Sequence, residues 1–123
     1  MLFDLNDKKT FKLIQEKLQN GIKDIESLFI ENEHVVGNYR AMNDRVVFTN
    51  KRIITMTISG FDFNSFPYNK IQYFSIEAVG DAEVEDFDNA LELLFTDGVN
   101  MEFIFVGSNN IQELSRMIGE FIL

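Results

Sequence analysis

The hydrophobic residues in the opening quarter of the chain recur at the spacing of an α-helix. Steps of three or four residues place five of them on one side of such a helix: Ile14, Leu18, Ile22, Ile25 and Phe29. Gly21 follows Asn20 and is a candidate break between two helices. We predict an N-terminal helical segment over residues 1–30 that packs on its own domain or docks on a partner. Its mixed charge does not favour a membrane-surface helix, which usually has a basic polar face.

From about residue 33 the hydrophobic period changes to two, which is the period of β-strands. Turn residues separate six further runs of this kind: 44–50, 52–58, 61–68, 71–79, 91–96 and 99–105. Asp97-Gly98 is a strong signal for a tight hairpin, because a type I′ turn needs positive φ at both central residues. Pro67 is the single proline and suits the end of an edge strand. The pattern predicts about seven strands in an antiparallel meander.

The chain closes with a second helical pattern. Its apolar stripe is Ile111, Leu114, Ile118, Phe121 and Ile122. Ser108, Asn109 and Asn110 are possible N-caps, and Glu113 stands three residues after Asn110 as in a capping box. A small, strongly bent sheet tends to close into a barrel or two near-orthogonal layers, and an amphipathic helix can plug its open end. The predicted fold class is mainly β: a seven-stranded antiparallel bent barrel over residues 31–123 with a C-terminal helical cap and the extra N-terminal helix.

Composition changes this picture little. The chain has 123 residues, of which 46% are hydrophobic and 25% charged, as in one ordinary globular domain. The absence of cysteine excludes disulfides and thiolate metal sites. No apolar run approaches the roughly 20 residues that span a bilayer, and the N-terminus lacks the pattern of a signal peptide. We expect a cytoplasmic protein without a cofactor.

Charge is distributed unevenly along the chain. The formal net charge is -9, and residues 71–123 hold eleven acidic residues against one basic residue, Arg116. This half of the chain should repel nucleic acid and anionic lipid at moderate salt. We therefore expect no nucleic-acid partner and do not expect membrane binding.

Three pieces of sequence carry a family resemblance when they are taken in order. They are RVVFTNKRII, with a turn at Phe48 to Arg52, FPYNKIQYFSIE from Phe66 to Glu77, and FDNALEL from Phe87 to Leu93. Together they resemble the bacterial pleckstrin-homology-like (PH-like) family over roughly residues 30 to 123. The resemblance implies a PH-like barrel with no known catalytic activity and a tendency to self-associate, often as rings, but it does not imply a lipid ligand. The chain departs from the family pattern at Ala90, where a second aspartate is expected, at Phe95, which is often tryptophan, and in the longer acidic segment 80–86.

Four cations beside the short turns of the middle strands are candidates for an anion site: Arg40, Arg45, Lys51 and Arg52. In eukaryotic PH domains a long basic loop surrounds the phosphate, whereas the turn here is short and contains Asp44. We therefore expect Lys51 and Arg52 to be solvated turn residues or partners in local ion pairs. The alternative is a peripheral module that binds anionic lipid.

Little in the sequence supports metal binding or catalysis. The acidic residues Asp81, Glu83 and Glu85 lack the glycine and the terminal glutamate of an EF-hand loop, so we predict a solvated acidic loop. His34 is the only histidine, and no G-x-S-x-G motif, P-loop or dinucleotide fingerprint accompanies it. We predict no metal site, no catalytic residues and no enzymatic activity.

The last two strands carry apolar residues on both faces. One face suits a core: Leu91, Leu93, Phe95, Phe103 and Phe105. Leu94, Ile104 and Val106 then point the other way, although a solvated antiparallel face should be polar. Either the N-terminal helix or a second subunit should cover these three residues. We predict a non-enzymatic module that acts through protein–protein contacts, as a homo-oligomer with this face as its interface or with a protein partner that the sequence does not identify.

Overall fold

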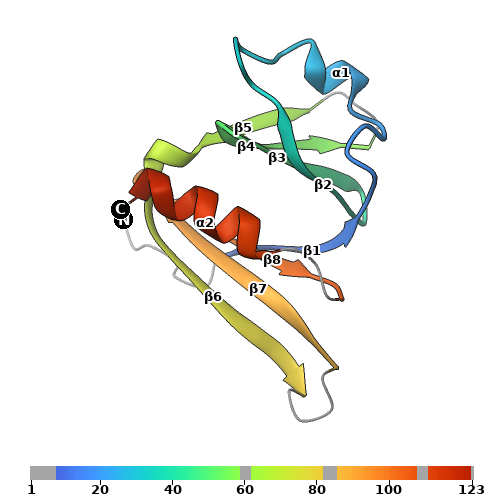
Figure 1. Ribbon diagram of the computed structural model, residues 1–123. Coiled ribbons are helices and arrows are strands. Elements are labelled where there is room, and N and C mark those ends of the chain that lie inside the picture. Colours follow the sequence, from blue (N-terminus) through green and yellow to red (C-terminus); the bar gives the residue numbers. More distant parts are fainter. Residues whose placement is uncertain (1–7, 59–61, 82–85, 108–110, 123) are drawn as a thin grey trace.

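The computed structural model describes residues 8–58, 62–81, 86–107 and 111–122. Within them eight strands form one curled sheet, and a long helix lies on its concave side (Figure 1). The strands are β1 (Lys9–Gln15), β2 (Val35–Ala41), β3 (Asp44–Thr49), β4 (Arg52–Thr57), β5 (Phe63–Pro67), β6 (Ile71–Asp81), β7 (Asp86–Phe95) and β8 (Asn100–Phe105). The helices are α1 (Lys23–Glu26), the 3₁₀ turn η1 (Tyr68–Lys70) and α2 (Ile111–Ile122).

The strands follow the order β5-β4-β3-β2-β1-β8-β7-β6 across the sheet. Neighbouring strands are antiparallel except β1 and β8, which pair in parallel with Phe11 opposite Phe103. Figure 1 shows the β2–β5 half and the β6–β8 half turned toward each other, with α2 between them. The seven predicted strands correspond to β2–β8, and Pro67 ends the edge strand β5. The predicted class, a mainly β, PH-like bent sheet with a C-terminal helical cap, is confirmed.

The core fills the space between the concave face and α2. Tightly packed aromatic rings lie at its centre: Phe103 stacks on Phe11 with ring centroids 5.4 Å apart and meets Phe48 edge-on at 5.3 Å. The helix adds Ile111, Leu114 and Ile118 to the same cluster. Burial of this stripe removes apolar surface of both helix and sheet from water, which is the reason for the cap. The predicted N-caps at 108–110 lie outside the described residues.

The hairpin between β7 and β8 forms at the predicted place but with another turn. Gly98 has a φ of 92°, whereas Asp97 keeps a negative φ, so the type I′ prediction is wrong. The N–H of Gly98 donates to the carbonyl of Phe95 at 2.9 Å, and the Asp97 carboxylate accepts the N–H of Val99 at 3.1 Å. This is the pattern of a three-residue loop that ends in a left-handed glycine.

The N-terminal helix predicted for residues 1–30 is wrong over most of the described part of that segment. Residues 9–15 form strand β1, in which Phe11 and Leu13 point into the core between exposed neighbours, and only Lys23–Glu26 is helical. Strand β1 takes the position between β2 and β8, where both of its edges find hydrogen-bond partners. This pairing satisfies the backbone of seven residues, whereas an amphipathic helix there would leave the facing edges of β2 and β8 open.

The segment after β1 covers the convex side of the β2–β5 half. Ile22 and Ile25 are buried there against Val47, Ile54 and Met56. Gly21 lies at the preceding turn with a φ of 69°, consistent with the predicted break. The segment therefore packs on its own domain, but on the opposite half of the sheet from Leu94, Ile104 and Val106. The proposed intramolecular cover of those three residues by 14–29 does not occur in the described structure.

The core phenol of Tyr39 makes stability depend on pH in the alkaline range. Burial, followed by the negative charge of Glu113, raises the pKa of Tyr39 from 10.0 to about 12. The unfolded chain therefore loses this proton at a lower pH than the folded chain, so stability present below pH 10 is lost as the pH rises toward about 12. At about pH 11 this loss amounts to ~1.4 kcal/mol.

Urea unfolding at neutral pH and at about pH 11 tests this expectation. Tyr39→Phe keeps the ring that meets Phe48 and Phe105 but removes the ionisable group. We expect the alkaline loss of stability to be smaller in this variant than in the parent chain. Equal losses in the two proteins would contradict the assignment to Tyr39.

Candidate functional site

The turn that joins β3 to β4 is organised by Thr49. Its hydroxyl oxygen accepts the N–H groups of Lys51 and Arg52, both at 3.0 Å, and donates to the carboxylate of Glu33 at 2.7 Å. A threonine at this position thereby satisfies backbone donors of a tight turn. The turn fixes the direction in which the two adjacent cations leave the chain.

Arg52 is held by a carboxylate and does not face a ligand. Its Nε and Nη2 atoms donate to the two oxygens of Glu33 at 2.9 and 3.0 Å, and Nη2 also donates to the carbonyl of Leu28 at 2.9 Å. Burial tends to raise the pKa of Glu33, but the hydrogen bonds from Arg52, Thr49 and the N–H of Ile30 outweigh it and lower that pKa below its usual value. The local ion pair expected at Arg52 is present, and its guanidinium charge is already neutralised.

Arg45 is similarly occupied on the convex side of the β2–β5 half. Its Nη1 donates to Glu16 at 2.8 Å and to the side-chain oxygen of Asn38 at 3.1 Å. The guanidinium lies directly under Gly21, where an added Cβ would come within 2.7 Å of it. The positive φ and the absence of a side chain at Gly21 together allow this close packing.

Arg40 and Lys51 are the two exposed members of the four candidate cations. Arg40 lies near the β2–β3 turn, opposite Arg45 in the strand register, whereas Lys51 lies in the β3–β4 turn at the other end of β3. The fold therefore does not gather the four predicted anion-binding residues around one point. Two are paired with carboxylates, and the two that face solvent stand at opposite ends of a strand.

The convex face of β8 and its neighbouring strands carries apolar side chains. Ile104 pairs with Ala90 of β7 on one side and Lys12 of β1 on the other, and all three point away from the core. Ile14 and Val106 follow in the same two strands and are 61% and 37% exposed. We call Ile14, Ile104 and Val106, with the buried Ala90 between strands, the convex patch.

A charged cluster borders the convex patch. Glu92 and Glu102 lie directly opposite each other across β7 and β8, and Lys8 contacts both carboxylates at 3.5 and 3.4 Å. Burial opposes the charge on Lys8, but its hydrogen bond and attraction to Glu102, followed by Glu92, raise its pKa. Beyond the cluster, Leu94 pairs with Tyr73, which is 57% exposed. The three residues predicted from the sequence therefore lie on one face, with Leu94 separated from Ile104 and Val106 by charge.

The family comparison agrees with this architecture. The family model described as "Bacterial PH domain" matches residues 4–122, which includes strand β1 and helix α2. The chain belongs to the bacterial PH domain family. Domains of this family are generally non-catalytic.

Relatives with known sequences or structures support the same assignment. The chain is 30% identical over 104 residues to the uncharacterized protein YozO of Bacillus subtilis, covering 81% of this chain and 88% of that protein. A DUF1696 family protein with a PH domain from Shewanella loihica has a similar structure, with a TM-score of 0.70, 24% identity and coverage of 92% and 99%. A PH-domain protein from Exiguobacterium sibiricum gives a TM-score of 0.67 at 14% identity, covering 93% of this chain and 62% of that one. At these identities the solved structures show the fold.

Sequence patterns alone missed some surface residues that now stand out. Ile14 was assigned to the inner side of a helix. In strand β1 it lies on the opposite face from Phe11 and Leu13, as alternation in a strand requires.

Among the described residues no three or more His, Asp or Glu side chains cluster as metal ligands. The described helices are all too short or too polar to cross a bilayer. Residues 82–85 of the acidic run lie outside the described part of the chain.

Proposed function

We propose that this bacterial PH domain is a non-enzymatic assembly module that binds a second copy of itself through the convex patch. The supporting observation is the exposure of Ile14 and Val106 beside the half-buried Ile104 on one strand face. A two-sided apolar strand face is costly in water unless another surface covers it. The neighbouring Lys8, Glu92 and Glu102 provide a polar border, as at the rim of protein–protein interfaces.

The positions of the four candidate cations favour protein contact over anionic lipid as the role of the domain. Arg45 and Arg52 are neutralised by Glu16 and Glu33, and the exposed Arg40 and Lys51 stand apart. A phosphate site needs several converging donors or cations. The overall charge of -9 adds long-range repulsion from an anionic surface.

Light scattering coupled to size-exclusion chromatography tests the assembly. We expect the parent chain to have a mass of at least two 14.3 kDa chains. Ile14→Glu and Ile104→Glu should each shift it toward 14.3 kDa, because they bring like charges together at the proposed interface. Met42→Glu is the matched control, since Met42 is 90% exposed and lies outside the convex patch.

A parent chain that remains a monomer up to millimolar concentration would refute the proposal. So would Ile14→Glu and Ile104→Glu variants whose mass equals that of Met42→Glu. Flotation with phosphatidylserine vesicles separates the lipid alternative, which predicts binding that Lys51→Ala weakens. We expect no flotation of the parent chain.

A further inference from the structure

The concave wall of the β3–β5 half changes from apolar to polar along the strands. Its inner end carries Phe48, Ile53 and Phe66 in one cross-strand row. Two rows further along, the inward positions are Asp44 of β3, Thr57 of β4 and Asp62, which directly precedes β5. The row between them contains Thr55 and Asn64. Asp62 and Asn64 are exposed and Asp44 is half-buried, so this end of the wall is open to solvent.

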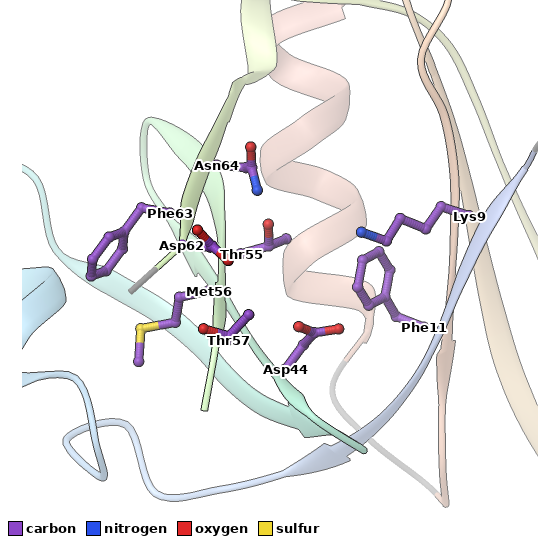
Figure 2. Close-up of a pocket in the computed structure, with 9 residues that line it drawn as sticks. All are labelled: Lys9, Phe11, Asp44, Thr55, Met56, Thr57, Asp62, Phe63 and Asn64. Atoms are coloured by element: carbon purple, nitrogen blue, oxygen red, sulfur yellow. The ribbon is translucent and has the colours of Figure 1, made fainter. Parts of the chain in front are cut away.

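A cavity of about 290 Å³ lies at this polar end of the wall. Figure 2 shows Asp44, Thr55 and Asn64 on its β3–β5 side. Thr55 is only 6% exposed, and its hydroxyl, which makes no hydrogen bond within the described part of the protein, is open to the cavity and not sealed in the core. The Asp44, Asp62 and Asn64 side chains also have no hydrogen-bonding or ionic partner there. The cavity thus combines the mostly buried Thr55 with three solvent-accessible polar side chains that have no partner within the described protein.

The opposite wall comes from β1 and brings a positive charge. Lys9 and Phe11 both line the cavity, and the Lys9 ammonium lies 5.1 Å from the centre of the Phe11 ring (Figure 2). Two carboxylates therefore face one ammonium across the same space. Met56 and Phe63 point away from Lys9 in this view, as expected for the outward positions of β4 and β5.

We propose that this cavity binds a free amino acid with a basic side chain. Ammonium groups of the ligand would lie on the Asp44 and Asp62 side, with Thr55 and Asn64 as further hydrogen-bond partners. The ligand carboxylate would face Lys9. The site has two negative charges and one positive charge, so a ligand with two ammonium groups and one carboxylate complements it.

Size and charge favour an amino acid over a phosphate or a bare divalent cation. A volume of about 290 Å³ lies just below the usual range for drug-sized ligands and suits a molecule as small as an amino acid. A phosphate would meet a net negative charge, because Asp44 and Asp62 outnumber Lys9. A bare divalent cation would find two carboxylates and a repelling Lys9, whereas calcium usually takes six to eight oxygen ligands.

The test is a ¹⁵N NMR titration of the full chain with L-lysine, with sodium chloride of equal ionic strength as the blank. We expect saturable shifts at the amides of β4 and β5 around Thr55 and Asn64. Asp44→Asn and Asp62→Asn should each raise Kd at least about tenfold, because each replaces a charged acceptor by a neutral one. Asp24→Asn makes the same charge change in α1, on the outside of the molecule, and should leave Kd unchanged.

Cadaverine, which has the same two amines without the carboxylate, tests the role of Lys9. We expect cadaverine to bind more weakly than L-lysine to the parent chain. Lys9→Gln should weaken lysine binding and spare cadaverine. Spectra of the variants report directly that each one is folded.

Absence of saturable shifts with L-lysine would overturn the proposal. Shifts that map outside the cavity, or equal binding of cadaverine and lysine, would also do so. The inference is independent of self-association, because the cavity is on the concave side and the convex patch is on the other face. A result against ligand binding in the cavity leaves self-association through the convex patch testable, and the reverse also holds.

Discussion

Replacing Phe103 with alanine is expected to lower the free energy of unfolding by about 3–5 kcal/mol. The side chain is fully buried at the centre of the core, where its ring packs on Phe11 and Phe48. Strand β8 lies between β1 and β7, so backbone pairing on both sides resists collapse of the cavity that the substitution leaves. The expected cost is a large part of the ~5–15 kcal/mol that stabilises a typical domain.

Urea unfolding followed by circular dichroism measures this change. Phe63→Ala removes the same atoms from the edge strand β5, where the side chain is 38% exposed. We expect it to cost well under half as much, because less area leaves water and the site opens to solvent. Equal costs at the two positions would show that Phe103 is not in the tightly packed centre.

Replacing Arg52 with alanine should be strongly destabilising although this side chain is partly exposed. The Glu33 side chain is completely buried in the ion pair, and the variant leaves this carboxylate without its bidentate partner. Removal of one member of a buried pair typically costs about 3–5 kcal/mol. Lys51→Ala, at the exposed neighbouring position, should change stability by no more than about 0.5 kcal/mol.

The same pair gives an acid dependence whose sign can be stated. The folded-state pKa of Glu33 lies below 4.5, so its stabilising contribution is fully present above pH 4.5 and is lost as the pH falls through the folded value. The parent chain should therefore lose more stability on acidification than Arg52→Ala does. If Arg52→Ala matched Lys51→Ala in stability and kept the parent's acid dependence, the pair would have no structural role. A Glu33→Gln/Arg52→Met double variant should recover part of the loss, since it removes both buried charges.

Local patterns predicted the second half of the chain well. Leu91, Leu93, Phe103 and Phe105 occupy every second position of their strands, and all four are buried as expected. The stripe of α2 was equally clear, and Ile111, Leu114 and Ile118 lie in the core. The alternation of a strand and the 3.6-residue period of a helix both record which side faces the core, so such elements can be recognised without knowledge of their partners.

The candidate sites were less predictable because they depend on distant partners. The sequence pointed to Arg52 as half of a cationic pair, but only the fold brings Glu33, nineteen positions earlier, onto its guanidinium. Leu94, Ile104 and Val106 were correctly expected to point away from the core, whereas their neighbour Ile14 was assigned to a helix. The polar cavity combines Lys9 of β1 with Asp44 and Asn64 of β3 and β5, and no spacing in the sequence connects these residues.

The sequence by itself determined a mainly β chain, the positions of seven strands and the helix that closes it, because these follow from each segment's own hydrophobic period. Only the tertiary structure decided that residues 9–15 form a strand. Their apolar spacing fits either a strand or the start of a helix, and the choice depends on the open edges of β2 and β8, which β1 joins. Hydrogen bonds to partners far away in the chain outweigh a local preference when two unpaired strand edges would otherwise remain.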